Sequence, residues 1–374
     1  MKNKFIFWFI LGANLILAFE LFSWAFFVLY AKDRLVYHSH VEESEFVKKM
    51  KDPDFSVTKS ESFSPVMGWD EAHGRVTDAS SLIAGGRKNP YESDKVKIST
   101  YGDSFTYCED VNEDETWQYY LSESSHTKVV NFGVRGYGPD QALLKMKKHL
   151  ESGIRTDVII LSILSENISR VVNVNTKFYW SVGDYGGFKP VLVKEAPGYK
   201  WIDNYLGDMD SGAGRAKAIS IVRKYDYWYK VNKDRPAIKF PYSLSLIKIA
   251  DYLLFKVKRW PDLWEEAPPT DVMRELVKIF YSLSQEYKFK PVVVFIPDSY
   301  DLKRKDKGKP QSYARFIKRL RADYGARGMV IVDILDEDIK TPLFNIAPYA
   351  GHASAYGNRA IAKAIYEKIK NNLD

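Results

Sequence analysis

The sequence predicts an α/β fold in which a parallel sheet is covered by helices on both faces, preceded by a membrane-spanning helix. Short apolar runs of strand length recur from residue 95 onward, and they are continuous rather than alternating, which is typical of strands buried on both faces. Segments with helical periodicity lie between these runs. Strands that alternate with helices indicate a parallel sheet in a three-layer domain.

The expected strands are rich in Val and Ile and are followed by polar loops. They cover residues 95–100, 128–132, 157–164, 291–297 and 329–334. The expected helices cover residues 115–124, 139–152, 270–287, 312–324 and 354–370. The α/β domain is therefore expected to cover residues 95–374.

Residues 5–30 form an apolar stretch of 26 residues without Lys or Arg. As a helix this stretch would be about 39 Å long, which exceeds a hydrocarbon core of about 30 Å. Glu20 and Asn14 oppose insertion, since a charged group at mid-membrane costs about 3 kcal/mol. The 16 Leu, Ile, Phe and Val residues favour insertion by up to about 0.4 kcal/mol each, so a membrane span is expected.

The apolar stretch predicts an uncleaved anchor over residues 1–34. A signal peptide has a shorter apolar region of about 7 to 15 residues and a small-residue cleavage site, whereas this stretch ends in VLYAKDRL. Lysines and arginines lie on both sides of it, so charge favours neither orientation strongly, but the very short N-terminal tail favours a cytoplasmic N-terminus. The rest of the chain is then expected outside the cytoplasm.

Two segments lie outside the strand and helix alternation. Residues 35–94 are polar and predict a linker with an N-terminal extension, whereas residues 170–266 predict an aromatic-rich insertion or cap. The aromatic residues are Tyr179, Trp180, Tyr225, Tyr227, Trp228, Tyr229, Trp260 and Trp264. They are consistent either with stacking on sugar rings or with ordinary packing. Within the insertion, residues 243–260 predict an amphipathic helix that either lies on a membrane or packs on the domain.

Composition excludes several classes of function. The formal charge of +7 is spread along the chain without a long basic run, so nucleic acid is not an expected partner. The single cysteine, Cys108, cannot form an internal disulfide. No His or Cys cluster has metal-ligand spacing, and the glycines near Gly133 lack the dinucleotide-binding pattern. We expect neither a metal nor a cofactor.

Polar residues follow the first three expected strands, where ligands of open parallel sheets bind. Ser104 follows the first strand in YGDSF, Gly136 the second in NFGVRGYG and Asn167 the third in LSENIS. His352 precedes the last helix. Taken singly, each residue is more typical of a helix cap, a turn or a structural histidine. Together they meet the needs of acyl transfer, because Ser104 requires a base such as His352 and the developing oxyanion requires hydrogen-bond donors.

The order Ser, Gly, Asn, His resembles that of the SGNH or GDSL hydrolase family. YGDSF, VVNFGVRG, ILSEN and GHASAYGNRAIA look like the four family blocks. The resemblance covers residues 95–170 and 290–372. It implies a flavodoxin-like α/β/α fold with Ser104 as nucleophile, Gly136 and Asn167 as oxyanion donors and His352 as base. Within the family, the chain looks most like membrane-anchored members associated with bacterial surface polysaccharides.

The sequence departs from the family pattern at two places. The third block keeps Asn167 but has Ser165 and Glu166 before it, where the family has Gly-x. The family's acid lies three residues before the histidine, and that position is Tyr349. His352 would then be oriented by a backbone carbonyl or by an acid from elsewhere, such as Asp333 or Asp336. Loss of the orienting acid can reduce the rate by orders of magnitude.

The resemblance and the apolar stretch together predict a membrane-anchored serine esterase or O-acyltransferase. It would act on ester groups, O-acetyl groups foremost, of a glycan or another acylated substrate at the outer face of a bacterial inner membrane. The absent acid leaves open a catalytically impaired glycan-binding or polysaccharide-assembly protein. The amphipathic helix over residues 243–260 leaves open a lipid esterase that works at the membrane surface.

Overall fold

The computed structural model describes residues 2–31, 43–59, 62–71, 86–179, 187–203, 205–233, 236, 238–345 and 351–373. Tyr349 and Trp180 lie outside these ranges. The strands are β1 (Phe63–Ser64), β2 (Gly68–Trp69), β3 (Val96–Tyr101), β4 (Lys128–Asn131), β5 (Val158–Leu164), β6 (Val191–Glu195), β7 (Gly198–Ile202), β8 (Lys290–Ile296) and β9 (Val330–Asp333).

The α-helices begin at the N-terminus and recur between the strands. They are α1 (Lys2–Ala25), α2 (Glu43–Lys51), α3 (Ser104–Tyr107), α4 (Trp117–Ser125), α5 (Pro139–Glu151), α6 (Gly212–Tyr225), α7 (Tyr227–Asn232), α8 (Tyr242–Phe255), α9 (Ala267–Tyr287), α10 (Ser299–Asp306), α11 (Ala314–Tyr324), α12 (Thr341–Phe344) and α13 (Ala355–Ile369). A π-helical turn (Phe26–Ala31) extends α1, and 3₁₀ turns include Ser165–Val172 and Trp260–Glu265.

The central sheet has five strands in the order β4-β3-β5-β8-β9, and all neighbouring pairs are parallel. This confirms the predicted α/β fold, and each expected strand corresponds to one strand of the sheet. The chain goes from β3 to one neighbour, β4, and then returns to β5 on the other side. The loops after β3 and β5 therefore diverge, and the crevice between them is where ligands of such sheets bind.

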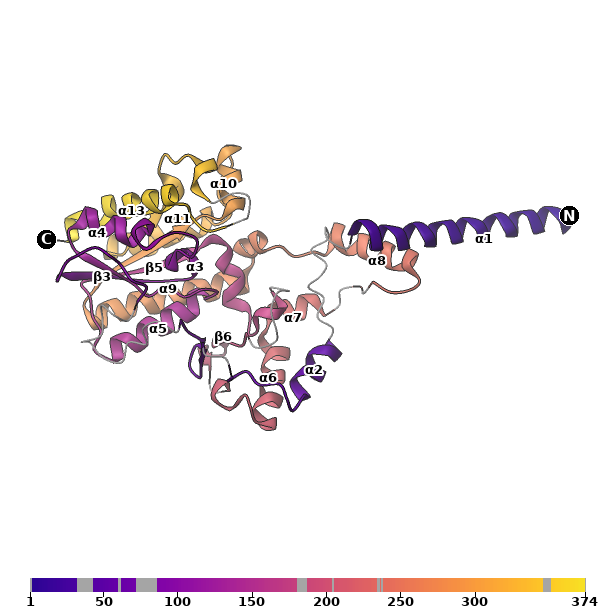
Figure 1. The fold of residues 1–374 in the computed structure, drawn as a ribbon, viewed down its shortest axis with the longest axis horizontal. Helices are drawn as coiled ribbons and strands as arrows, with labels where there is room; N and C mark the ends of the chain where they lie inside the picture. Colours follow the sequence, from indigo (N-terminus) through magenta and orange to yellow (C-terminus); the bar gives the residue numbers. More distant parts are fainter. Residues whose placement is uncertain are drawn as a thin grey trace.

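Helices cover both faces of the sheet, as the continuous apolar strands require (Figure 1). One face packs on α4 and α13, where Trp117, Leu121 and Ile361 are completely buried. The other face packs on α5 and α9, where Met146 and Phe280 are completely buried. All seven residues of β5 are buried, since this strand lies in the middle of the sheet.

Some of the segments outside the α/β alternation also pack on the domain. Helix α2 lies within the stretch that the sequence predicts as a linker, and its Phe46 and Met50 belong to the core. The β6–β7 hairpin and helices α6, α7 and α8 lie between β5 and α9 in the chain, and none of them adds a strand to the central sheet.

Of the aromatic residues of the expected cap that the structure describes, Trp228, Tyr229 and Trp264 are buried, and the others are partly buried and pack against the core. The indoles of Trp228 and Trp264 are buried and donate hydrogen bonds to the backbone carbonyls of Ser169 and Ser165. These two tryptophans pack the insertion against the loop after β5. Stacking on sugar rings is therefore not available to them.

Helix α1 extends away from the domain (Figure 1). Among the described residues, one helix, over Lys4–Leu29, is long and apolar enough to cross a membrane, and its most apolar window of 18 residues is not buried inside the protein. Length and composition are thus consistent with an anchor or a signal sequence.

Candidate active site

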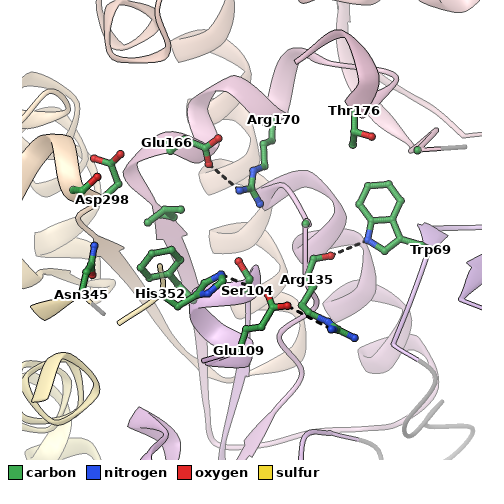
Figure 2. Close-up of a pocket in the computed structure, with 15 residues that line it drawn as sticks. Trp69, Ser104, Glu109, Arg135, Glu166, Arg170, Thr176, Asp298, Asn345 and His352 are labelled. Atoms are coloured by element: carbon green, nitrogen blue, oxygen red, sulfur yellow. Dashed lines mark hydrogen bonds and ion pairs between the residues drawn. The ribbon is translucent and has the colours of Figure 1, made fainter. Parts of the chain in front are cut away.

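A cavity of about 710 Å³ opens at the carboxyl ends of β3 and β5. Ser104, Gly136 and His352, three of the four residues singled out in the sequence, line it (Figure 2). Further lining residues are Trp69, Phe105, Glu109, Arg135, Leu164, Glu166, Arg170, Thr176, Gly187, Asp298, Ser299 and Asn345. The fold thus brings together residues from both ends of the domain sequence.

Ser104 is the first residue of the short helix α3, directly after the turn that ends β3. Asp103 caps this helix, because its Oδ1 accepts the N–H of Phe105 at 3.0 Å. The N–H groups of Thr106 and Tyr107 bond to the carbonyl of Asp103. Ser104 is 7% exposed, and its own N–H has no recorded acceptor within the described part of the chain. That N–H is therefore available to a ligand in the cavity.

Gly136 belongs to the turn after β4 and adopts a φ of 78°, a backbone conformation that glycine adopts at no steric cost. The turn is closed by a hydrogen bond from the N–H of Tyr137 to the carbonyl of Val134. A second glycine brings this loop close to α3, since a Cβ at Gly133 would lie 2.4 Å from the N of Tyr107. The backbone at Gly136 consequently reaches the cavity that Ser104 lines.

His352 is held by a carboxylate that the sequence analysis did not identify. Its ring Nδ1 lies 2.8 Å from Oδ2 of Asp110, and its backbone N–H donates to the same oxygen at 3.1 Å. Because an ionised carboxylate only accepts, Nδ1 carries the proton and Nε2 is left as an acceptor. Partial burial opposes ionisation of Asp110, but the hydrogen bonds from His352 lower the pKa of Asp110 below its usual range.

The acids proposed from the sequence do not perform this role. Asp333 is buried and accepts hydrogen bonds from Tyr313 and the N–H of Leu335. Asp336 forms an ion pair with Arg321 on the protein surface. The position three residues before His352, Tyr349, lies outside the described residues. Asp110, six residues after Ser104, lies in the loop that follows α3.

Arg87 holds the loop that carries Asp110. Its guanidinium donates to the carbonyls of Tyr107 and Val111, each at 2.6 Å, and to that of Cys108. Cys108 ends α3 with a φ of 64°, is buried and has no disulfide partner; burial raises the pKa of its thiol to about 12. The thiol is thus inert, and the loop rather than the cysteine contributes to the site.

Charged side chains lie next to one another beside His352. Oε2 of Glu109 lies 3.6 Å from Nε2 of His352, and Oε1 of Glu109 lies 3.4 Å from Arg135. Arg135 is in turn bound in a bidentate manner by Glu71, at 2.9 and 3.1 Å. Glu109 therefore places a carboxylate near Nε2 of His352, whereas Arg135 balances the charge of Glu109.

Asn167 is not among the residues that line the cavity. It is 1% exposed, and its amide donates to Oδ2 of Asp103 at 3.0 Å. Arg170, which does line the cavity, lies 3.6 Å from the same Oδ2. Asp103 thus joins the loop after β3 to the loop after β5. An oxyanion-donor role for Asn167 stays a prediction.

Asp298 adds a titratable group to the cavity. Burial raises its pKa to about 7, and the nearby carboxylates of Asp301 and Glu166 add to the shift. Asp298 is thus protonated at lower pH, where it has an O–H donor, and negatively charged at higher pH.

We expect the preference for anionic substrates to fall as the pH rises through about 7. The ratio of kcat/KM for an anionic to a neutral nitrophenyl ester should fall about fivefold, since a like charge at about 4 Å costs about 1 kcal/mol in water. Steady-state kinetics between about pH 6 and pH 8 measure this ratio, in which pH effects common to both substrates cancel. Asp298→Asn should make it constant, and a constant ratio in the wild type would contradict this role.

No family model and no curated protein matches the sequence. Solved structures similar to the chain include a protein assigned to the lipolytic G-D-S-L family from Desulfitobacterium hafniense, with a TM-score of 0.38 and 10% identity over 72% of this chain and 98% of that one. A G-D-S-L family member from Veillonella parvula has a TM-score of 0.34 and 12% identity over 74% and 98%. An acetyl xylan esterase from Butyrivibrio proteoclasticus has a TM-score of 0.34 and 10% identity over 76% and 66%. At these scores and identities, function is inferred from the residues of the site.

Proposed function

We propose that this protein is an SGNH-type serine esterase or O-acyltransferase, anchored in the membrane by α1, that acts on ester groups of a glycan outside the cytoplasm. The contact between Asp110 and His352 carries the proposal. With Ser104 in the same cavity, it supplies the third member of an acid, base and nucleophile set.

The geometry supports a sequence of proton and acyl transfers. Ser104 Oγ attacks the acyl carbonyl while Nε2 of His352 accepts its proton. Asp110 stabilises the imidazolium through Nδ1, and Glu109 does so from the Nε2 side. His352 then protonates the leaving alcohol. Water or a sugar hydroxyl, deprotonated by His352, attacks the acyl-serine and releases Ser104.

The N–H groups of Ser104 and Gly136 support an oxyanion hole next to the nucleophile. Both residues line the cavity, and neither N–H has a recorded acceptor in the described ranges. In the resting structure no hydrogen bond is recorded between the side chains of Ser104 and His352. Such contacts are often long in free enzymes and shorten when substrate binds.

A glycan substrate is supported by the remaining wall of the cavity. The indole of Trp69 is fixed by a hydrogen bond of 2.9 Å to the carbonyl of Arg135 and presents an aromatic surface (Figure 2). Carboxylates of Glu166 and Asp298 and the guanidinium of Arg170 offer acceptors and donors for hydroxyl groups. The alternative of a catalytically impaired binding protein was motivated by the absent acid before His352, and the contact between Asp110 and His352 argues against it.

Labelling with a fluorophosphonate tests the proposal, because this probe reacts with an activated serine without knowledge of the natural substrate. We expect the full chain in detergent to be labelled, and Ser104→Ala and His352→Ala to lose the label. Ser299→Ala, at another serine of the same cavity, is the matched control and should retain it. A folded wild type that resists labelling would refute the esterase proposal.

A further inference from the structure

Helix α8 lies beside the part of α1 that is nearest the domain (Figure 1). Phe27, in the π-helical turn that extends α1, forms a buried cluster with Ile249 and Tyr252 of α8, and Leu246 and Leu253 pack against it. The apolar residues of α8 that face inward thus contact the candidate membrane helix. This contact distinguishes α8 from a helix that packs on the catalytic domain.

Glu20 joins α1 to the beginning of α8. Its carboxylate accepts the backbone N–H of Ser243 at 2.9 Å and that of Tyr242. The residue before α8, Pro241, provides no side-chain cap, so Glu20 satisfies N–H groups that the first helical turn leaves unpaired. The acidic residue that opposes insertion in the sequence therefore has a binding partner 222 positions away.

The opposite face of α8 is apolar and exposed. Leu254 and Phe255 are 73% and 79% exposed, and Phe240, just before the helix, is 73% exposed. Leu244 and Ile247 extend this surface along the helix. A contiguous surface of this kind is unfavourable in water and marks a contact with an apolar partner.

Charges on α8 indicate how deep this face lies. Lys248 and Asp251 are exposed among its apolar residues, and Asp251 forms an ion pair of 2.5 Å with Lys256. Such charges are costly at the centre of a bilayer but favourable at the headgroup level, where lysines meet anionic lipids.

The length of the candidate span also places α8 at the level of the lipid headgroups. The helix over Lys4–Leu29 has 26 residues, whereas about 20 suffice to cross the hydrocarbon core. The surplus of about six residues allows the end that α8 contacts to lie at the membrane boundary.

We propose that α8 is an interfacial membrane helix whose exposed face, Phe240, Leu244, Ile247, Leu254 and Phe255, is covered by lipid acyl chains. Helices α1 and α8 then form a two-helix membrane element, held together by Glu20 and the Phe27 cluster. This inference rests on the anchoring part of the proposed function and is independent of its chemistry. The partner is a lipid bilayer, because α8 contacts α1, whose own apolar side chains are exposed and which is long enough in sequence to cross a membrane.

Fluorescence in vesicles tests the proposal. The full chain is reconstituted into vesicles of phosphatidylethanolamine and phosphatidylglycerol, and an environment-sensitive fluorophore is attached to Leu254→Cys. We expect emission at shorter wavelength and strong quenching by lipids that carry a nitroxide near the headgroup. Leu15→Cys in α1, quenched by deep nitroxides, verifies reconstitution, and Lys318→Cys on the exposed side of α11 should not be quenched.

Two results at position 254 would overturn the proposal. Water-like emission without quenching, while position 15 is quenched, would show that α8 lies outside the bilayer. Emission at shorter wavelength without quenching would show that protein, such as a second copy, covers the face. Neither the emission nor the quenching measurement requires ester turnover. Failure of the membrane-helix proposal is therefore distinguishable from failure of the esterase proposal.

Variants of Glu20 test how α8 is held. Glu20→Leu removes the acceptor and should at least halve the quenching at position 254, whereas Glu20→Gln keeps one carbonyl acceptor and should retain most of it. Equal quenching in all three proteins would overturn the role of Glu20. Ester turnover in detergent should be the same in all three.

Discussion

Asp110→Asn should lower kcat/KM for ester hydrolysis by about 10²-fold to 10⁴-fold without unfolding the protein. The amide cannot neutralise the imidazolium. It can also donate to Nδ1 of His352, which would favour the wrong tautomer of the ring. The side chain of Asp110 is 39% exposed, so stability should change little. Steady-state kinetics with a nitrophenyl ester, together with thermal unfolding, measure both quantities.

Glu109→Gln is the matched control in the same loop. Glu109 lies 3.6 Å from Nε2 of His352 but shares its charge with Arg135, so its removal should cost about tenfold or less. Asp333→Asn tests the acid that the sequence suggested. It should affect stability and leave kcat/KM within a few-fold of wild type. Unchanged turnover in Asp110→Asn, with a large loss in Asp333→Asn, would contradict the assignment of Asp110.

Lys189→Met should lower the free energy of unfolding by about 3 to 5 kcal/mol. Lys189 and Asp140 form an ion pair in which both side chains are at most 1% exposed. The pair joins the segment before β6 to the beginning of α5. Removal of the lysine leaves a buried carboxylate without its cation, which is the costly part of breaking such a pair. Urea unfolding of the full chain in detergent, followed by tryptophan fluorescence, measures the change.

Two variants control this measurement. Lys189→Met combined with Asp140→Asn should recover more than half of the loss, because no unpaired charge then remains buried. Lys224→Met, which breaks an exposed pair with Glu195, should cost less than about 1 kcal/mol. A loss in Lys189→Met that the second substitution does not reduce would show that packing, rather than charge, is responsible.

The loss in free energy of unfolding caused by Lys189→Met should depend on pH. Burial raises the pKa of Asp140, and the charge of Lys189 opposes that shift. Without Lys189, the pKa of Asp140 in the folded state rises further above its value in the unfolded chain. The folded protein then binds a proton that the unfolded chain releases, so stability is highest at low pH and is lost as the pH rises. The loss in free energy of unfolding should thus be smaller at about pH 5 than at about pH 8.

The fold could be predicted because its signals are local. The apolar runs of β3, β5 and β8 are buried on both faces, and the helices between them carry one apolar face each. Ser104 and Gly136 could be placed at the carboxyl edge of the sheet for the same reason, since parallel strands end at a common edge. The insertion was less predictable, because the aromatic content of residues 170–266 fits a buried and an exposed arrangement equally well.

The acid of the site could not be predicted from local pattern. An acidic pair, Glu109 and Asp110, follows the helix that Ser104 begins, and this was the available signal. Nothing in that pair indicates that His352, 242 positions later, would lie 2.8 Å away. The position of Asp110 depends on Arg87, which binds the carbonyls of the loop from outside the strand and helix alternation.

By itself the sequence determined the α/β class, the order of strands and helices, the apolar N-terminal stretch and the strand-end positions of Ser104, Gly136 and Asn167. These follow from periodicity and from turn chemistry, which act over a few residues. Only the tertiary structure decided that Asp110 orients His352, that Asn167 binds Asp103 and that Glu20 caps α8. A polar side chain bonds to whichever partner the fold brings within about 3 Å, and that choice has no period in the sequence.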